Sequence, residues 1–581
     1  MNRLVAGCGL VCAFWLALPG VCAAQLMVEG LPRWGFDGKV RVGRFNLLTV
    51  EVFNSSDRPW QGNPKLEAAT GFGGGDIPVI QQGLYVEPYG RRRLQFLVFT
   101  PRVTDYRLSW GRREGEQFLI DEPASTMRLA EVQFAESNPL LSSLADMPRF
   151  DDADFPPSAA GLETLAVVNL DHVPGWNDAQ NRAFLDWLSA GGTLHLYQGS
   201  GGTNPAFRGT LSVLNEPSDN FPIGAGQVVR HAAGIQTAEV PEKEAAESNN
   251  RYRMWEPTRS SLELLKMMTQ PDHNWGVIYL MTIAYLLLIF PGCWLLGRKK
   301  GDYRITYGAI LGIVLLFSVG FRTVGARGYG ENTSVHSVAL AQPASGNRAL
   351  LTQWSSLFVT GGGEYEIKHQ TEGTVYSSGQ LDERIPGFVL NRPVSLMMTD
   401  IASFSARTFI QAGVLSSLPL APKILKFEQE EGNGSLKSLQ LKSLELEFAD
   451  DSLWKDDGLF RGVVLAGDRI YVLQPQGNSL VAATGGQSLK EVINQSDWTV
   501  GRYAFSNQTR TPPQLFESLR GPLIAYDLNL GSDEDVDSFV LPRGQAKAYL
   551  YVRLPDNARL EGDRFTQQSG RMLYVLPIRE Q

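Results

Sequence analysis

The sequence predicts a multi-domain membrane protein that consists of a β-sandwich, an α/β domain, a two-helix transmembrane hairpin and a β-rich C-terminal region, in that order. Two uncharged apolar runs lie in the middle of the 581-residue chain, at 276–297 and 305–321. Each is close to the roughly 20 residues that a helix needs to cross a hydrocarbon layer of about 30 Å. Short segments of alternating apolar and polar residues dominate both flanks, and an apolar strand followed by an amphipathic helix interrupts the first flank.

The chain begins with a predicted signal peptide at residues 1–24. Arg3 supplies a positive charge, residues 4–18 are apolar, and small residues precede Gln25. This segment would direct the following domain out of the cytoplasm. An uncleaved signal anchor is the alternative, and it places the following domain on the same side.

Cysteine usage and net charge exclude several classes of function. Of the four cysteines, Cys8, Cys12 and Cys22 fall in the signal peptide and Cys293 lies in the first apolar run. The exported domains therefore have no thiol for a disulfide, a thiolate nucleophile or a cysteine-based metal site. The six histidines are scattered, so we expect no metal site and no cofactor. The formal net charge of −8 argues against nucleic acid as a partner.

Residues 25–122 predict an immunoglobulin-like β-sandwich. Several short segments alternate between apolar and polar residues, and turn residues separate them. The alternating apolar positions include Leu48, Val50, Val52, Leu94, Phe96 and Val98. The stretch 42–54 resembles the opening of Ig-like domains in bacterial envelope proteins, in which an aromatic residue anchors the core and an asparagine closes the strand.

Residues 125–235 predict an α/β domain. Leu165–Leu170 is a continuous apolar run, which is typical of a strand buried on both faces of a parallel sheet. A helix is predicted to begin at Asn177 or Asp178 and to end at a pair of glycines, and a second strand follows at 193–197. Strand, helix and strand in this order form a βαβ unit of an open sheet.

The segment 165–197 resembles the class I glutamine amidotransferase-like domain of bacterial membrane proteins. In that domain, a helix with a tryptophan and a Gly-Gly pair follows an apolar strand that ends in aspartate, and the matching residues here are Asp171, Trp187, Gly191 and Gly192. The resemblance implies a flavodoxin-like fold. True amidotransferases use a cysteine nucleophile, and because this domain contains no cysteine we expect it to be a scaffold kept for binding or shape.

Three residues of this domain are candidates for catalysis. Asp171 and His172 follow the first apolar strand, at the edge where open α/β sheets bind ligands, and a histidine beside an aspartate suits general acid–base chemistry. Ser200 lies in the glycine-rich turn 199–202 after the next strand. The alternative is that Asp171 closes a turn. We expect this structural role and no enzymatic activity.

Residues 236–274 are predicted to form a linker and a juxtamembrane helix, whose leucines and methionines either lie at the membrane surface or pack on the exported domain. Two transmembrane helices are predicted at 275–297 and 305–323. The loop 298–304 between them carries four basic residues and one aspartate, so the positive-inside rule assigns it to the cytoplasm. Both large flanks are then expected on the outer side.

Residues 331–581 predict a β-rich region with one or two further β-sandwiches and a short helix at 487–494. Glycine-rich turns separate its strands. The predicted strands are 335–340, 394–398, 439–448, 463–473, 523–528, 546–554 and 572–578.

The order of these parts resembles a group of uncharacterised bacterial envelope membrane proteins. With the predicted topology, the resemblance implies a multi-pass protein of the inner (cell) membrane whose two large domains lie on the periplasmic or extracellular side. We expect a non-catalytic scaffold or accessory protein of a cell-envelope complex, with the lipid bilayer and other envelope proteins as partners. Two alternatives stay open: an accessory subunit of an ABC-type export system, and a hydrolase or ligand-binding enzyme that uses Asp171, His172 and Ser200.

Overall fold

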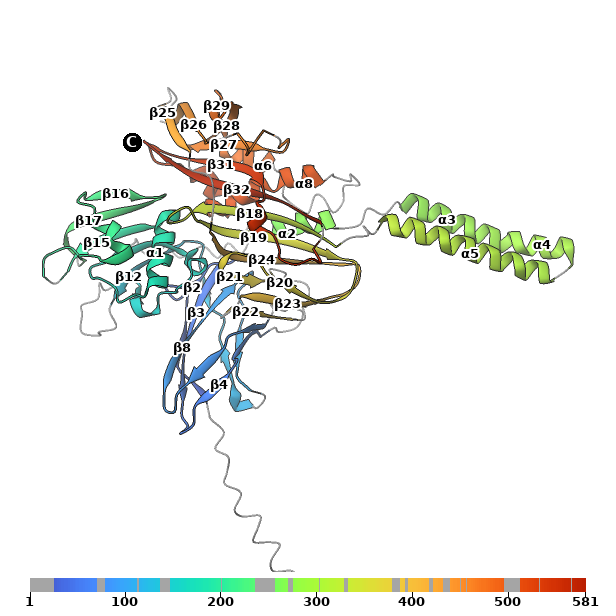
Figure 1. Ribbon diagram of the computed structural model, residues 1–581, viewed down its shortest axis with the longest axis horizontal. Helices are drawn as coiled ribbons and strands as arrows, with labels where there is room; N and C mark the ends of the chain where they lie inside the picture. The colour runs from blue at the N-terminus through green and yellow to red at the C-terminus, as the bar shows by residue number, and fades with distance from the viewer. Residues whose placement is uncertain are drawn as a thin grey trace, which may run out of the picture.

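Strands make up most of the structure, and one pair of long helices projects from the strand-rich part (Figure 1). The β-rich character of the chain is thus confirmed. The predicted signal peptide, 1–24, lies outside the residues that the structure describes. The computed structural model describes residues 26–69, 79–111, 114–135, 147–199, 201–235, 256–269, 275–301, 303–328, 333–378, 387–391, 395–416, 422–431, 439–449, 451–455, 457–495, 512–531, 533–565 and 567–580.

Most N-terminal strands lie in two sheets that share one apolar core. Two short pairs accompany them, β2 (Lys39–Val40) with β11 (Ala124–Ser125) and β4 (Trp60–Gly62) with β7 (Leu84–Val86). The first sheet has the order β1 (Leu26–Trp34), β3 (Phe45–Asn54) and β8 (Arg91–Phe99). The second contains β10 (Gln117–Ile120), β9 (Tyr106–Ser109), β5 (Lys65–Ala68) and β6 (Val79–Gln81). Val50 and Phe96 lie at predicted alternating positions of the first sheet, and they share a buried core with Leu108 of the second.

Strands that follow the helix pair in the sequence complete the second sheet. β22 (Gly387–Leu390) runs parallel to β6, and β23 (Leu396–Ile401) and β20 (Gly363–Ile367) continue the sheet beyond it. The sequence does not predict this pairing, because alternation shows which face of a strand is buried and not which strand lies beside it. The two flanks of the helix pair are therefore parts of one folded body.

Residues 130–234 contain a six-stranded sheet with the order β13-β12-β14-β15-β17-β16. All neighbours are parallel except β16 and β17. The predicted βαβ unit is present, because α1 (Asp178–Ala190) connects β14 to β15. The strands are β12 (Ala130–Ala135), β13 (Arg149–Asp151), β14 (Leu165–Leu170), β15 (Thr193–Gln198), β16 (Asn220–Ile223) and β17 (Gly226–Gly234).

Local signals fix the two ends of α1. The Asn177 side chain accepts a hydrogen bond from the backbone N–H of Gln180 at 3.1 Å, and the Gln180 side chain accepts one from the N–H of Asn177 at 3.1 Å. This reciprocal pair is a capping box. At the other end, Gly191 has a φ of 129°, which favours glycine and stops the helix.

Trp187 holds α1 against the sheet. Its side chain is 4% exposed, and its Nε1 donates a hydrogen bond to the carbonyl oxygen of Leu165 at 2.8 Å. A Cβ at Gly192 would lie 2.4 Å from the Trp187 ring, so the second glycine of the pair is needed for this close approach. Trp187 and the glycine pair therefore act together in packing α1 against the sheet.

The C-terminal region forms a sheet of twelve strands with the order β21-β24-β19-β18-β32-β31-β27-β28-β29-β26-β25, and β30 pairs with β28. Its core contains apolar side chains from both early and late strands of the region. The strands are β18 (Ser334–Pro343), β19 (Ala349–Val359), β21 (Glu372–Ser377), β24 (Ser405–Leu415), β25 (Lys423–Glu431), β26 (Leu439–Glu447), β27 (Arg461–Ala466), β28 (Arg469–Gln476), β29 (Ser479–Ala482), β30 (Gln487–Ser488), β31 (Gln545–Arg553) and β32 (Gln567–Arg579).

Two of the predicted strands of this region are wrong in detail. The segment 523–528 is helical, because it belongs to α9 (Arg520–Asp527), whose apolar residues are buried on all sides. A short apolar run does not distinguish a buried strand from a buried helix. The segment 463–473 is a hairpin of two strands that turns at Gly467, where φ is 61°. The predicted short helix is confirmed as α6 (Leu489–Gln495).

Helix α2 (Pro257–Thr269) packs on the body. Leu262, Leu264 and Leu265 are buried in the main apolar core, and the hydroxyl groups of Thr269 and Ser356 are 3.1 Å apart. Ser356 lies on β19, which follows the helix pair in the chain. Of the two open alternatives for this helix, the structure supports packing on the folded body and not on a membrane surface.

Two helical segments, Gly276–Lys299 and Tyr303–Val324, are long and apolar enough to cross a membrane. The first comprises α3 (Trp275–Leu287), a π-helical turn (Leu288–Gly292) and α4 (Cys293–Lys300), and the second lies in α5 (Tyr303–Gly328). Apolar side chains exposed along the length of two helices mark a surface that contacts lipid or another protein. The exposed side chains include Leu280, Leu287, Phe290, Leu311, Leu316 and Val319.

We predict that Trp187→Ala lowers the thermal stability and the cellular abundance of the protein. Truncation of a buried tryptophan costs about 3–5 kcal/mol. The control Trp187→Phe keeps an aromatic ring and loses the hydrogen bond to Leu165, so it should cost about 1 kcal/mol for that bond plus a smaller packing loss. Thermal melting and immunoblots of both variants test this. Equal melting of Trp187→Ala and wild type would contradict the packing role.

Candidate functional site

The structure brings Asp171 and His172 together at the carboxyl end of β14. His172 Nδ1 lies 3.0 Å from Asp171 Oδ1, so the two adjacent side chains do face each other. On the other side of the ring, His172 Nε2 lies 3.4 Å from Asp152 Oδ2. This second contact is an ion pair whose geometry does not meet that of a hydrogen bond. The imidazole is therefore held between two carboxylates.

The two aspartates keep His172 charged. Burial by itself lowers the pKa of His172, but the contacts and negative charges of Asp152 and Asp171 outweigh it and raise the pKa to about 9. At neutral pH the ring is an imidazolium, which has no lone pair to accept a proton. The arrangement therefore supports a structural ion pair and not a general base at neutral pH.

An aromatic cluster fixes the position of Asp152. Trp176 Nε1 donates a hydrogen bond to the Asp152 carbonyl oxygen at 2.7 Å, and the Trp176 ring stacks on Phe155 at 4.5 Å. Phe134 and Phe184 pack edge-on against Phe155. The sequence does not reveal Asp152 as a partner of His172. The acidic run 151–154 was the available signal, but it lies too far along the chain for spacing to reveal the contact.

The third candidate, Ser200, lies outside the described residues. Of its described neighbours, Gly202 donates its backbone N–H to the Gly199 carbonyl oxygen at 2.9 Å. The structure thus brings together two of the three predicted residues, Asp171 and His172.

A pair of histidines lies on one face of the same sheet. His195 Nδ1 on β15 and His231 Nε2 on β17 are 2.9 Å apart, and the ring of Tyr197 stacks on His231 at 4.4 Å. One nitrogen must donate and the other accept, so at least one ring is neutral in this arrangement. Within the part of the chain that the structure describes, no three potential ligands from histidine, cysteine, aspartate and glutamate converge on a metal-sized site.

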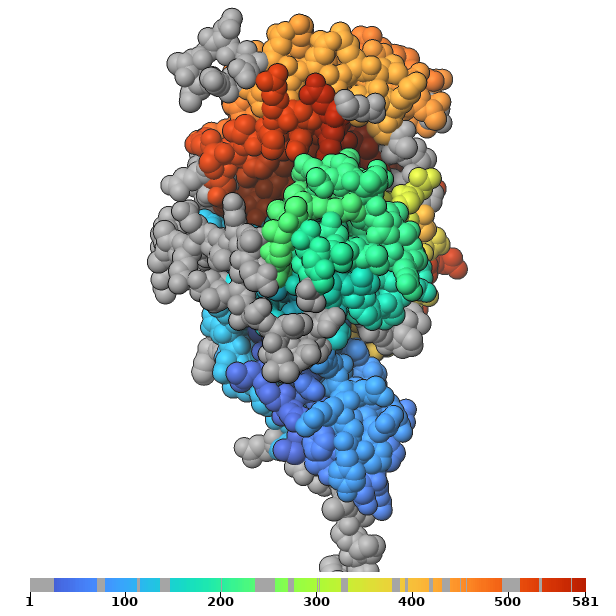
Figure 2. Space-filling view, turned by 90° about the vertical axis from the view of Figure 1, so that its left-hand side faces the viewer, coloured from blue at the N-terminus to red at the C-terminus, as the bar shows by residue number. Residues whose placement is uncertain are grey.

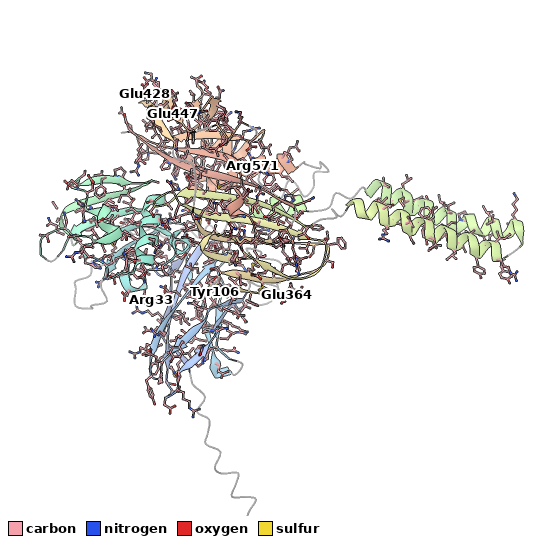
Figure 3. The ribbon with its side chains drawn as sticks, in the orientation of Figure 1. Arg33, Tyr106, Glu364, Glu428, Glu447 and Arg571 are labelled. Carbon is pink, nitrogen blue, oxygen red and sulfur yellow. The ribbon has the colours of Figure 1, made fainter. Side chains whose placement is uncertain are left out.

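Asp154 connects the α/β sheet to the N-terminal sheets. Its side chain is 1% exposed and accepts from Arg93 Nη1 at 2.6 Å and from Arg33. Figure 3 labels Arg33 where the N-terminal strands meet the α/β part. Burial raises the pKa of Asp154 more than the two arginines lower it. This junction would be destabilised by removal of either arginine, because a buried carboxylate would lose a partner.

A second junction joins all three parts of the body at Tyr526. The Tyr526 hydroxyl donates to Glu163 Oε2 at 3.0 Å, Thr352 donates to Glu163 Oε1 at 2.7 Å, and the Arg44 guanidinium lies 3.6 Å from the centre of the Tyr526 ring. These four residues also line a cavity of about 410 Å³. Figure 2 shows the α/β part seated between the N-terminal and C-terminal parts. Because each of its charged groups has a partner, we interpret the junction as structural.

Comparisons with known proteins assign no family to this chain. No protein-family model matches the sequence, and no functionally characterised protein matches it at a significant level. Among solved structures, the chain is similar to a cycloisomaltooligosaccharide glucanotransferase from Paenibacillus sp. in complex with cycloisomaltoheptaose, with 8% sequence identity over 80% of this chain and 99% of that chain. The TM-score is 0.15, which carries no argument about fold or activity.

We predict that the His172 ion pairs make the stability of the protein depend on pH. The pKa of this group is raised on folding from its usual value of about 6.5, so its contribution is fully present below about pH 6.5 and is lost as the pH rises through about 9. A shift of this size corresponds to at most about 3 kcal/mol.

Thermal melting of wild type and His172→Gln between these pH values provides the measurement. The wild type should lose stability over this range relative to the variant. His231→Gln is the matched control, because it removes a histidine that contacts another histidine and not a carboxylate. Parallel pH curves for wild type and His172→Gln would refute the assignment.

Proposed function

We propose that this protein is a membrane-anchored scaffold or accessory subunit of a bacterial cell-envelope complex. In this proposal the α/β part is a flavodoxin-like, amidotransferase-like domain that serves binding or shape. The observation that supports it best is the construction of one body from both flanks of the helix pair, through β6 with β22 and α2 with β19. Such a body is suited to holding a binding surface at a fixed place beside a membrane.

The connections of the helix pair support a body on one side of the bilayer. α2 ends at Thr269 and β18 starts at Ser334, and both pack in the body, so the two open ends of the helix pair return to the same place. The turn between the helices, at Gly301, lies at the other end (Figure 1). The basic residues around this turn favour the cytoplasm by the positive-inside rule. The body would then lie outside.

We predict that an alkaline phosphatase fused after Gln581 is active and that the same enzyme inserted at Gly301 is inactive. A fluorescent protein that folds only in the cytoplasm should give the reverse pattern at the two positions. Both fusions are read in the full chain, so the anchor is intact. Cytoplasmic fluorescence from the fusion after Gln581 would rule out the proposed topology.

The experiment that tests the scaffold role is crosslinking in intact cells followed by mass spectrometry. We predict crosslinks from the exported body to other envelope proteins. A variant in which Arg33 and Arg93 are both replaced by Gln is the control, because loss of the two partners of Asp154 should loosen the body and reduce these crosslinks. Crosslinks to lipid-embedded proteins alone, with none from the body, would contradict the proposal.

The same crosslinking experiment tests the export alternative, and a point variant tests the enzyme alternative. Crosslinks to an ATPase and its permease would favour an accessory subunit of an ABC-type export system. The enzyme alternative would be favoured if Asp171→Asn abolished cellular function while the protein accumulated and melted as wild type does. The scaffold proposal instead expects Asp171→Asn to keep function, because in that proposal Asp171 only stabilises the charged ring of His172.

A further inference from the structure

We propose that the C-terminal region binds a small organic anion, a carboxylate or phosphate group attached to a compact apolar portion, in a hollow at Arg520. The hollow has a volume of about 410 Å³, which is in the range of small-molecule sites. It lies between the β27–β28 hairpin and the start of α9. Its lining includes Trp454, Phe460, Arg461, Val472, Gln474 and Arg520.

The charged groups around the hollow are paired, with one exception. Asp457 accepts two hydrogen bonds from Arg571 Nη1, at 2.8 and 2.7 Å, and Figure 3 labels Arg571 on β32. Arg461 Nη2 lies 2.8 Å from Glu517 Oε1. The Arg520 side chain makes neither a hydrogen bond nor an ion pair with any residue in the described ranges. Its guanidinium is therefore the one in the hollow that has no counter-charge in contact among those residues.

The environment of Arg520 makes this lack of a partner costly. The residue is half-buried, and burial lowers the pKa of its guanidinium. The nearby charge of Arg461 also lowers that pKa, whereas Glu517 raises it. A partly desolvated charge without hydrogen bonds destabilises a protein, and a bound anion would remove the penalty through charge-assisted hydrogen bonds.

The second guanidinium of the hollow can take part in the same site. Arg461 uses Nη1 to donate to the Phe460 carbonyl oxygen at 2.8 Å, and its contact with Glu517 is an ion pair without hydrogen-bond geometry. Arg461 is thus paired with Glu517 but has five N–H donors, so donors remain for a ligand. Two arginine side chains present planar, forked donors that match the oxygens of a carboxylate or phosphate group. Among the lining residues the only anion is Asp457, which Arg571 already occupies.

The rest of the lining indicates what the anionic group is attached to. Trp454 and Phe460 precede β27 and pack with their ring centres 5.6 Å apart, largely buried in the wall of the hollow. Val472 lies on β28 and is 53% exposed. Gln474 adds a neutral amide that can donate or accept. A ligand with one anionic end and a small apolar or aromatic body would use both kinds of surface.

The test uses the full chain in detergent micelles, with benzoate, phenyl phosphate and inorganic phosphate as probes. We expect benzoate or phenyl phosphate, at up to about 10 mM, to raise the melting temperature saturably, and neutral benzamide to have no effect. In the variant Arg520→Gln we expect at least about a tenfold loss of affinity by calorimetry. This variant should melt no lower than wild type without a probe, because it removes an unpaired charge. Arg553→Gln, an exposed arginine outside the hollow, should bind as wild type does.

If Arg520→Gln fails to fold, Arg520→Lys provides a second test. It keeps the positive charge but loses the planar, forked guanidinium, so it should bind the anions more weakly than wild type. Nanodiscs of phosphatidylglycerol, compared with phosphatidylcholine, distinguish a lipid headgroup from a soluble anion as the natural source. Stabilisation by phosphatidylglycerol that Arg520→Gln abolishes would assign the site to a headgroup. The proposal is overturned if none of the anions stabilises wild type beyond chloride at equal ionic strength, or if Arg520→Gln binds them unchanged.

Discussion

The pairing of β22 with β6 is the constraint on which the rest of the structure depends. β6 precedes the helix pair in the chain and β22 follows it, so this sheet forms only when both flanks lie on the same side of the helix pair. α2 repeats the constraint, because it also precedes the helix pair and packs on β19 behind it. A helix pair inserted in this way has both ends fixed to one body, which gives the body a defined orientation relative to any membrane that the pair enters.

Buried charges, and not apolar contact alone, close the seams between the parts of this body. Asp186 of α1 accepts from Arg348 Nη2 at 2.7 Å, in the turn between β18 and β19, and Asp154 accepts from Arg93 Nη1 at 2.6 Å. Glu163, which is half-buried, accepts from the Thr352 hydroxyl at 2.7 Å. A buried carboxylate that loses its partner costs about 3–5 kcal/mol. These contacts thus penalise a change in the relative position of the parts more sharply than apolar packing would.

Local features of the sequence predicted local structure well but did not predict contacts between segments that are distant in the chain. The capping residue Asn177 and the glycine pair bounded α1 because both act within a few residues. The alternating strands were identifiable, but the parallel contact of β6 with β22 joins segments separated by about 300 residues, and no local pattern encodes it. The same limit applies to His172, whose neighbour Asp171 was visible in the sequence while Asp152, which completes its charge environment, was not.

The contrast between His172 and Arg520 shows why a motif and a site need not coincide. Asp171 and His172 have the residue types of an acid–base pair at the usual edge of an open sheet, yet two carboxylates flank the ring and hold it charged. Arg520 belongs to no motif and lies just before the segment 523–528, whose apolar pattern suggested a strand. Its guanidinium is half-buried beside a second arginine and faces a hollow without a counter-charge in contact. Since folding alone favours satisfied charges, a charge that the described fold leaves unsatisfied is the better indication of a ligand.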